Sequence, residues 1–262
     1  MLVARRAGIL KYIQSKGEIS TGELFDLFPG FTPKTIRRDL AFLERAGAIL
    51  RSHGRARVNR QYLLQPESHY SERESENMPE KYAIAELASG LLDGRRSIFL
   101  DSGTTMMALA HCLPDANLSI LTAAPNIALY IAAQKPTCSV LLTGGNLNPK
   151  TLSCSGYGSI EQLGFINIDL AFMAASGFSQ ANGFTVGEQF ECELKRAVVA
   201  KAGRVVMLMD SSKIGLSMPF TFARPPDIDT LIGDARLDGD NERFLTQKGV
   251  RVLKAERNIG DL

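Results

Sequence analysis

The chain has 262 residues, of which 45% are hydrophobic and 22% are charged, so it can form one large domain or two smaller ones, each with its own core. This composition excludes a chain that is disordered throughout its length. The longest apolar runs, such as 97–100 and 139–143, end within a few residues at Asp, Gly or Pro, far short of the roughly 20 residues that span a bilayer. We therefore expect no transmembrane helix and no membrane partner.

The N-terminal sequence carries two early arginines and no long apolar stretch, so we expect a cytoplasmic protein rather than a secreted one. The chain has four widely spaced cysteines, Cys112, Cys138, Cys154 and Cys192. None belongs to a Cys-x-x-Cys pair, and no histidine stands at the spacing of a metal site. We interpret all four as buried free thiols and expect neither a metal nor a cofactor.

The formal net charge of +2 conceals an asymmetry along the chain. Residues 1–65 contain twelve of the 30 basic residues and five of the 28 acidic ones, so this segment has a net charge of +7. Residues 66–262 contain the other 18 basic and 23 acidic residues and have a net charge of −5. A basic segment indicates polyanion binding, because each Lys or Arg that neutralises a phosphate releases a condensed counterion. Charge alone does not separate nucleic acid from an anionic membrane surface.

Helical periodicity predicts three helices in the basic segment. The first ends at Lys16-Gly17, where glycine suits the left-handed residue after a helix. The second is short and opens with a capping box between Ser20 and Glu23. The third opens with an N-cap and a proline at Thr32-Pro33 and ends at Ala46-Gly47.

The third helix is the candidate DNA reader. Its apolar stripe is predicted to pack on the other two helices, while four polar residues of its first two turns project outward: Lys34, Thr35, Arg37 and Arg38. Arginine can bind guanine through O6 and N7, threonine can meet a phosphate or a thymine methyl, and lysine suits phosphate. A solvated basic helix face is the alternative. The three capped helices and the +7 charge together favour double-stranded DNA.

Two short β-like runs around Gly54 follow and predict a hairpin wing. The candidate DNA-contacting residues of this wing are Arg51, His53, Arg55 and Arg57. Wing arginines reach flanking phosphates or the minor groove, where potential rather than base identity is read. We interpret His53 as a turn residue rather than a pH switch.

These features resemble the winged helix-turn-helix domain of the DeoR family of bacterial transcriptional regulators. The resemblance rests on Ile9-Leu10, on the run Thr35-Ile-Arg-Arg-Asp-Leu40 and on Arg51-Ser-His-Gly54. Arg55 departs from the family pattern, which usually has a second glycine there. The resemblance implies a DNA-binding domain over residues 1–58.

Residues 59–81 are polar and mixed in charge, which predicts a linker between two domains. From residue 82 helix-like and strand-like runs alternate, which predicts an α/β fold. We expect helices at 83–92, 104–112, 127–133, 188–202 and 241–248, and strands at 97–100, 118–122, 139–143, 168–174, 205–209, 229–232 and 250–253.

Three predicted strand ends carry residues suited to a phosphate. The loop 101–105 reads Asp-Ser-Gly-Thr-Thr and precedes a helix, so backbone N–H groups and hydroxyls can bind an anion there, or simply cap the helix. Gly144 and Gly145 either let the backbone approach a ligand or make a turn. Lys213 lies at the carboxyl edge where open α/β sheets bind ligands, with a solvated turn lysine as the alternative.

The body over residues 82–262 resembles the DeoR-family C-terminal sensor domain, which is related in fold to ribose-5-phosphate isomerase. The matching stretches include Ile98–Thr105, Thr143–Gly145, Glu191–Arg196 and Asp210–Lys213. The resemblance implies a sensor that binds a phosphorylated sugar or related metabolite. The candidate effector-binding residues that it implies are Asp101, Ser102, Gly103, Thr104, Thr105, Asn126, Gly144, Gly145, Glu191 and Lys213.

Two stretches of the body depart from the family pattern. Ala123-Ala124 stand where the family usually has Asn-Ser, and Ala174-Ala175-Ser176-Gly177 replaces Gly-Ala-Asp-Gly. The lost amide and carboxylate are hydrogen-bonding groups that a ligand could have used.

The resulting hypothesis is a repressor of carbohydrate-metabolism genes that binds operator DNA as a homodimer or homotetramer and responds to a phosphorylated sugar. One alternative is a DNA-binding protein whose body only oligomerises. Another is a sugar-phosphate isomerase, which needs a carboxylate base; the candidates are Asp101, Glu188, Glu191 and Asp210. The fused winged helix has no use in an isomerase, so we expect no enzyme.

Overall fold

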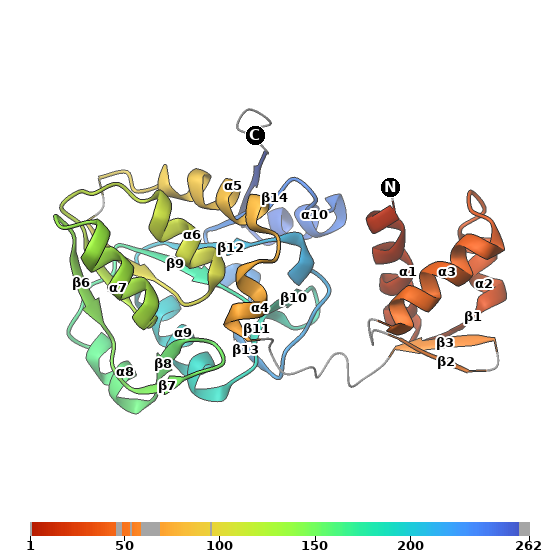
Figure 1. Cartoon of the computed structure of the whole chain (residues 1–262), viewed down its shortest axis with the longest axis horizontal. Coiled ribbons are helices and arrows are strands. Elements are labelled where there is room, and N and C mark those ends of the chain that lie inside the picture. Colours follow the sequence, from red (N-terminus) through yellow and green to blue (C-terminus); the bar gives the residue numbers. More distant parts are fainter. Residues whose placement is uncertain (1, 46–48, 53, 59–68, 95, 257–262) are drawn as a thin grey trace. The chain divides into compact units, whose positions relative to one another are not determined.

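The computed structural model describes residues 2–45, 49–52, 54–58, 69–94 and 96–256. It divides the chain into two compact units, Met1–Gln65 and Pro66–Leu262 (Figure 1). Each unit has its own apolar core or cores.

The first unit is a winged helix-turn-helix. Its elements are α1 (Leu2–Lys16), β1 (Glu18–Ser20), α2 (Thr21–Leu27), α3 (Pro33–Arg45), β2 (Ile49–Ser52) and β3 (Arg55–Val58). The strands form an antiparallel sheet in the order β1-β3-β2. Three predicted helix ends are confirmed: Gly17 has a φ of +77°, Ser20 and Glu23 form both bonds of the capping box, and Thr32 Oγ1 accepts from the Thr35 N–H at 3.3 Å. The predicted end of the third helix at Ala46-Gly47 lies outside the described residues. The short strand β1 was not predicted; it pairs with the wing and thereby joins the wing to the helices.

A buried carboxylate joins α1 to α3. Asp39 is fully buried and accepts hydrogen bonds from Arg5 Nε at 2.5 Å and Arg6 Nε at 2.9 Å. Burial by itself would raise the pKa of Asp39, but the two arginines outweigh it and lower the pKa. With Asp39 held inward, the neighbouring Arg37 and Arg38 are exposed.

We expect Asp39→Asn to lower the free energy of unfolding of the first unit by about 2–3 kcal/mol, because two charge-assisted hydrogen bonds lose their acceptor charge. Since folding lowers the pKa of Asp39, its contribution is present above the ordinary value of about 3.9 and is lost as pH falls through the lower folded value. Hydrogen exchange of the α1 and α3 amides in the full chain, from about pH 7 down to about pH 3, measures both effects.

The control for this prediction is Glu44→Gln, which removes an exposed carboxylate paired with Arg51 at 3.4 Å. Exposed pairs contribute about 0–1 kcal/mol, so this variant should exchange almost as the wild type does. Equal protection in the two variants would contradict the role assigned to Asp39.

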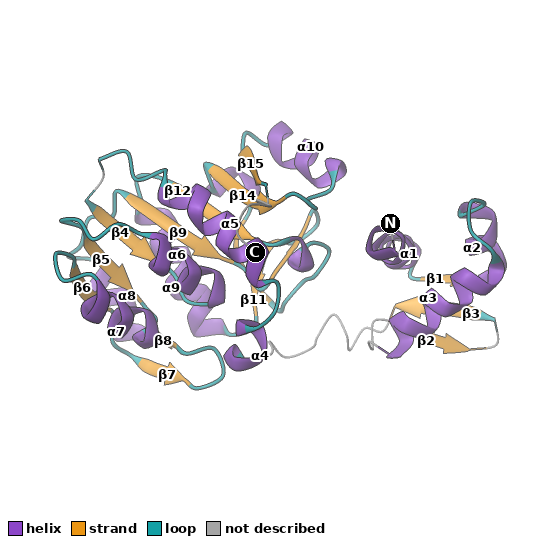
Figure 2. Cartoon of the chain, turned by 45° about the horizontal axis from the view of Figure 1, so that its top comes forward, coloured by secondary structure: helices purple, strands orange, loops and turns teal. Residues whose placement is uncertain are grey.

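The second unit is built on a seven-stranded parallel sheet in the order β15-β14-β12-β9-β4-β5-β6 (Figure 2). Its strands are β4 (Ser97–Leu100), β5 (Ser119–Thr122), β6 (Ser139–Leu142), β9 (Leu170–Ala174), β12 (Val205–Met209), β14 (Thr230–Asp234) and β15 (Arg251–Ala255). Its helices are α4 (Tyr70–Glu74), α5 (Met78–Ser89), α6 (Thr104–Cys112), α7 (Pro125–Gln134), α8 (Tyr157–Leu163), α9 (Gln189–Lys201) and α10 (Gly239–Gln247).

The sheet separates two apolar cores, because successive side chains of a strand point to opposite faces. In β4, Phe99 belongs to one core, while Ile98 and Leu100 belong to the other. Residues of α5, α6 and α7 pack in the core of Ile98, and residues of α8, α9 and α10 pack in that of Phe99. The predicted α/β architecture is therefore confirmed as a helix–sheet–helix sandwich.

The order of the strands reverses between β4 and β9. From β4 the chain continues through β5 to β6 on one side, and from β9 it continues through β12 and β14 to β15 on the other. Ligands of open α/β sheets bind beyond the carboxyl ends of the strands at such a switch point. We therefore expect a ligand site at the loops after β4, β9 and β12.

Smaller elements lie outside the main sheet. They are the antiparallel sheet of β10 (Gly177–Ser179), β11 (Gly183–Val186) and β13 (Phe220–Ala223), the ribbon of β7 (Asn146–Asn148) and β8 (Ser153–Ser155), and the 3-10 turns η1 (Ser211–Lys213) and η2 (Pro225–Asp227). None of these was predicted, nor was α8, because each is only three to seven residues long. Periodicity over so few residues carries little signal.

Two expectations need correction. Residues 69–81, expected to belong to the linker, instead form α4 and the start of α5 within the second unit, where Tyr70 and Lys81 are buried. Of the four cysteines, only Cys154 and Cys192 are buried; Cys112 and Cys138 are half-buried, and all four are free. No helix in the described parts of the chain has the length and apolarity needed to cross a membrane.

Candidate functional site

A pocket of about 560 Å³, its open mouth included, lies at the switch point of the sheet. All of its lining residues belong to the second unit. They come from four stretches, 73–81, 102–105, 174–176 and 208–213, together with Thr151, Glu191 and Lys195. Residues 102–105 follow β4, residues 174–176 end and follow β9, and residues 208–213 end and follow β12. These are the strand ends on either side of the point where the strand order reverses.

The loop after β4 forms an uncapped helix N-terminus in this pocket. Gly103 is the N-cap residue of α6, with a φ of +112° that disfavours any side chain, and no side chain caps the helix. The first N–H groups of a helix have no partner within it, and they carry a partial positive charge. The hydroxyls of Ser102, Thr104 and Thr105 belong to the same buried loop. This loop can therefore bind an anion through backbone and side chains together.

A buried ammonium lies behind the loop. Lys195 of α9 contacts Asp101 Oδ2, lies 3.2 Å from Glu191 Oε1 and donates to the Ala174 carbonyl at 3.1 Å. Asp101 also accepts from the backbone N–H groups of Ser102 (2.8 Å) and Ala174 (2.9 Å). Burial alone would lower the pKa of Lys195, but the two carboxylates outweigh it and raise the pKa. We call Lys195, Asp101 and Glu191 the buried triad.

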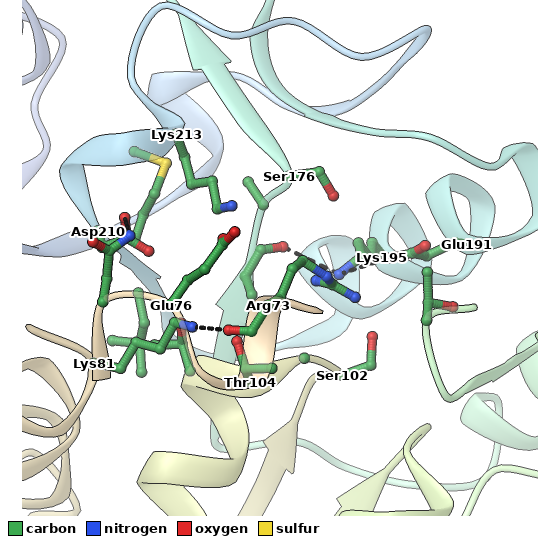
Figure 3. A pocket seen from close by; sticks show the side chains of 18 residues that line it. Arg73, Glu76, Lys81, Ser102, Thr104, Ser176, Glu191, Lys195, Asp210 and Lys213 are labelled. Atoms are coloured by element: carbon green, nitrogen blue, oxygen red, sulfur yellow. Dashed lines mark hydrogen bonds and ion pairs between the residues drawn. The ribbon is translucent and has the colours of Figure 1, made fainter. Parts of the chain in front are cut away.

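Three further cations line the pocket. Lys213 lies on η1 and is half-buried, and Arg73 lies on α4, also half-buried (Figure 3). Lys81 of α5 is 3% exposed and donates to the Arg73 carbonyl at 2.5 Å. Burial lowers the pKa of Lys81, while the carboxylate of Asp210 opposes this shift. Asp210 accepts from the N–H of Ser212 at 2.9 Å and so holds the η1 turn.

Six of the ten predicted effector-binding residues line this pocket: Ser102, Gly103, Thr104, Thr105, Glu191 and Lys213. Asp101 does not line it, because its carboxylate is engaged in the buried triad. Asn126 is outside the lining residues too, in the first turn of α7.

The predicted glycine pair also lies outside the pocket lining. Gly145 has a φ of +106°, and a Cβ placed there would lie 2.4 Å from Ser159 Oγ. Ser159 Oγ in turn donates to the Gly144 carbonyl at 2.6 Å. The pair makes a close turn against α8, which is the alternative that the sequence had left open.

Sequence reasoning did not assign pocket roles to Arg73, Glu76, Lys81 and Lys195. Helical spacing gives no signal for this set, because Arg73 lies on α4, Lys81 lies on α5, and Asn77 between the two helices has a left-handed φ of +50°.

The predicted recognition residues lie on α3 of the first unit. Lys34, Arg37 and Arg38 are exposed. Thr35 is half-buried, and its Oγ1 lies 3.0 Å from Thr32 Oγ1, so it takes part in the helix cap. The three basic side chains are therefore the ones available to reach a base edge.

The predicted wing residues are spread over β2 and β3. Arg51 is paired with Glu44 at 3.4 Å, and Arg55 with Glu18 at 3.0 Å. Arg57 is exposed on β3. His53 lies outside the described residues.

Sequence comparisons agree with the two units. The profile of the DeoR-like helix-turn-helix domain matches residues 5–62, and that of the DeoR C terminal sensor domain matches residues 76–235. The uncharacterized HTH-type transcriptional regulator YulB of Bacillus subtilis is 34% identical over 253 residues, which cover 96% of this chain and 96% of that protein. The glycerol-3-phosphate regulon repressor of Escherichia coli is 28% identical over 232 residues, which cover 88% and 90%.

Among solved structures, ribose 5 phosphate isomerase A from Neisseria gonorrhoeae is similar over 52% of this chain and 53% of that one, with 13% identity and a TM-score of 0.38. The two profiles together cover both units, and the curated relatives align along almost the whole chain. The chain belongs to the DeoR family of DNA-binding transcriptional regulators.

Proposed function

We propose that this regulator is a cytoplasmic repressor of carbohydrate-metabolism genes whose affinity for operator DNA is controlled by a phosphorylated sugar or related metabolite. The observation that carries the proposal is the uncapped N-terminus of α6, which opens into a pocket lined by Lys213. A phosphate there would accept hydrogen bonds from backbone N–H groups and from the hydroxyls of Thr104 and Thr105.

The remaining lining groups suit the rest of a sugar phosphate. Glu76 and Asp210 are carboxylates, which accept hydrogen bonds from sugar hydroxyls. One relative is named for the regulon of glycerol-3-phosphate, a small phosphorylated polyol, which supports this class of ligand. Ser176 lines the same pocket in place of the carboxylate usual in the family, so this chain offers a hydroxyl to the sugar at that position.

Binding rather than catalysis is the role that fits the carboxylates. Of the four candidate bases for an isomerase, Asp101 and Glu191 are ion-paired with Lys195, and Glu188 is exposed at the start of α9 outside the pocket lining. The fourth, Asp210, lines the pocket and accepts hydrogen bonds from Asn77 Nδ2 and the Ser212 N–H, so its carboxylate holds the η1 turn and the neighbouring helix. The curated relatives are transcriptional regulators, which supports the same conclusion.

The exposed basic residues of α3 would read the operator from the major groove, with the wing arginines at the flanking phosphates. We propose a homodimer or homotetramer, because symmetric oligomers read symmetric half-sites. The ligand would act by binding one arrangement of the oligomer more tightly than another.

The test of the proposal is fluorescence anisotropy of labelled DNA from upstream of the gene, against scrambled DNA at fixed salt, with and without a panel of sugar phosphates. Salt is fixed because non-specific affinity depends on it steeply. Specific binding that the panel changes is the expected result. Specific binding that no panel member changes would contradict the assigned effector class.

For DNA reading, we expect Arg37→Ala to cost about 1–3 kcal/mol, or about 5- to 150-fold in Kd, and to relax the preference at one operator position. The reason is the loss of a bidentate contact to guanine. Anisotropy with operators substituted one base pair at a time measures this. Arg243→Ala, an exposed arginine of α10, is the control. Equal weakening on operator and scrambled DNA would instead indicate a phosphate contact.

For effector binding, we expect Lys213→Ala to weaken binding of the sugar phosphate by about 10- to 150-fold, since a hydrogen bond to a charged group contributes about 1.5–3 kcal/mol. Isothermal titration calorimetry measures the change. Lys248→Ala removes an exposed lysine that does not line the pocket and is the control. An affinity of Lys213→Ala that matches the control would remove Lys213 from the site.

A further inference from the structure

One wall of the pocket is made by the first stretch of the second unit that the structure describes. This stretch, residues 69–81, contains α4 and the start of α5. The Tyr70 N–H donates to the Lys150 carbonyl at 2.8 Å, and Asn77 Nδ2 donates to Asp210 Oδ1 at 3.3 Å. Hydrogen bonds at both ends therefore hold this wall against the sensor. We call residues 69–81 the strap.

The strap brings an arginine to the helix N-terminus that the proposed function uses. Arg73 Nη1 lies 4.0 Å from the point that a Cβ on Gly103 would occupy, so its guanidinium stands beside the first turn of α6. Lys213 reaches the same pocket from η1, on a different wall (Figure 3). An arginine presents a rigid fork of N–H donors that matches two phosphate oxygens, whereas a lysine offers a point charge. The two cations are thus complementary in chemistry and in position.

The position of Arg73 is itself held by a buried group. Lys81 donates to the Arg73 carbonyl at 2.5 Å and is nearly inaccessible to solvent. Five charged groups gather here, since Asp210, Lys213, Glu76 and Arg73 all act electrostatically on Lys81. Three of the five are cations and two are carboxylates, so this half of the pocket carries a net charge of +1. An incoming dianion would relieve the repulsion among the three cations.

We propose that Arg73 binds the phosphate of the effector from a different wall than Lys213, so that a phosphomonoester dianion clamps the strap onto the loop 102–105. This inference rests on the proposed function of the pocket. Its consequence is regulatory: the strap precedes the rest of the sensor in the chain and follows directly from the segment that leads from the DNA-binding unit. Effector binding then fixes the part of the sensor closest in sequence to that unit.

The experiment uses the full chain and four probes: inorganic phosphate, glycerol 3-phosphate, ribose 5-phosphate and glucose 6-phosphate. Titration calorimetry compares the wild type with Arg73→Gln, Arg73→Lys and the control Arg196→Gln, which changes an exposed arginine of α9 outside the pocket. For the tightest probe we expect Arg73→Gln to bind about 10- to 150-fold more weakly than the wild type, with Arg73→Lys in between and the control equal to the wild type.

A second readout follows the strap in the wild type by hydrogen exchange. Saturating probe should slow exchange at the amides of residues 70–77 at least tenfold. Glu76 and Asn77 also line the pocket, so the same measurement is made on Arg73→Lys, which keeps the charge. A smaller slowing in this variant supports the role of Arg73, and a slowing equal to that of the wild type overturns it, should Arg73→Gln fail to fold.

The outcomes separate the two proposals. If no probe binds the wild type, the proposed function fails and the role of Arg73 with it. If a probe binds the wild type and Arg73→Gln equally, or leaves exchange at residues 70–77 unchanged, the strap has no part in the site while the proposed function stands.

Discussion

The sensor unit depends on the ion pairs of one buried ammonium. Lys195 joins Asp101 at the end of β4, Ala174 at the end of β9 and Glu191 on its own helix. Removing one partner of such a buried group typically costs about 3–5 kcal/mol, because the remaining charge is left without compensation. The two strands it joins are those between which the strand order reverses. The buried triad therefore fixes the floor of the pocket and, through the Ser102 N–H, the start of the loop 102–105.

The cations of the second unit consequently divide into two kinds. Lys195 is neutralised by two carboxylates, and Lys81 supports the strap through the Arg73 carbonyl. Their charges serve the structure, whereas Arg73 and Lys213 lie at the pocket surface. In the proposed function, the phosphate of the effector would meet the α6 N-terminus and these two side chains.

The sequence was informative where a residue's role depends on its immediate neighbours. The strands at 97–100 and 205–209 and the helix at 104–112 have the predicted bounds, because their apolar patterns and end signals are local. The role of Asp101 was not predictable, because its partner lies 94 residues further along the chain. The sequence of residues 69–81 predicts a linker, because a wall that faces a polar pocket has the composition of a solvated segment. The glycine pair at 144–145 fitted two interpretations, which only the close approach of Ser159 separates.

The charged side chains of the first unit also divide into a buried, paired set and an exposed set. Within the run Thr35–Leu40, Arg37 and Arg38 point outward while Asp39 is turned inward to the arginines of α1. The orientation of α3 is thereby set in part by contacts inside the first unit. In the proposed function, a metabolite bound to the second unit would alter DNA affinity by favouring one arrangement of the DNA-binding units over another. Along the chain that preference would pass through the strap, which is the first described stretch of the second unit.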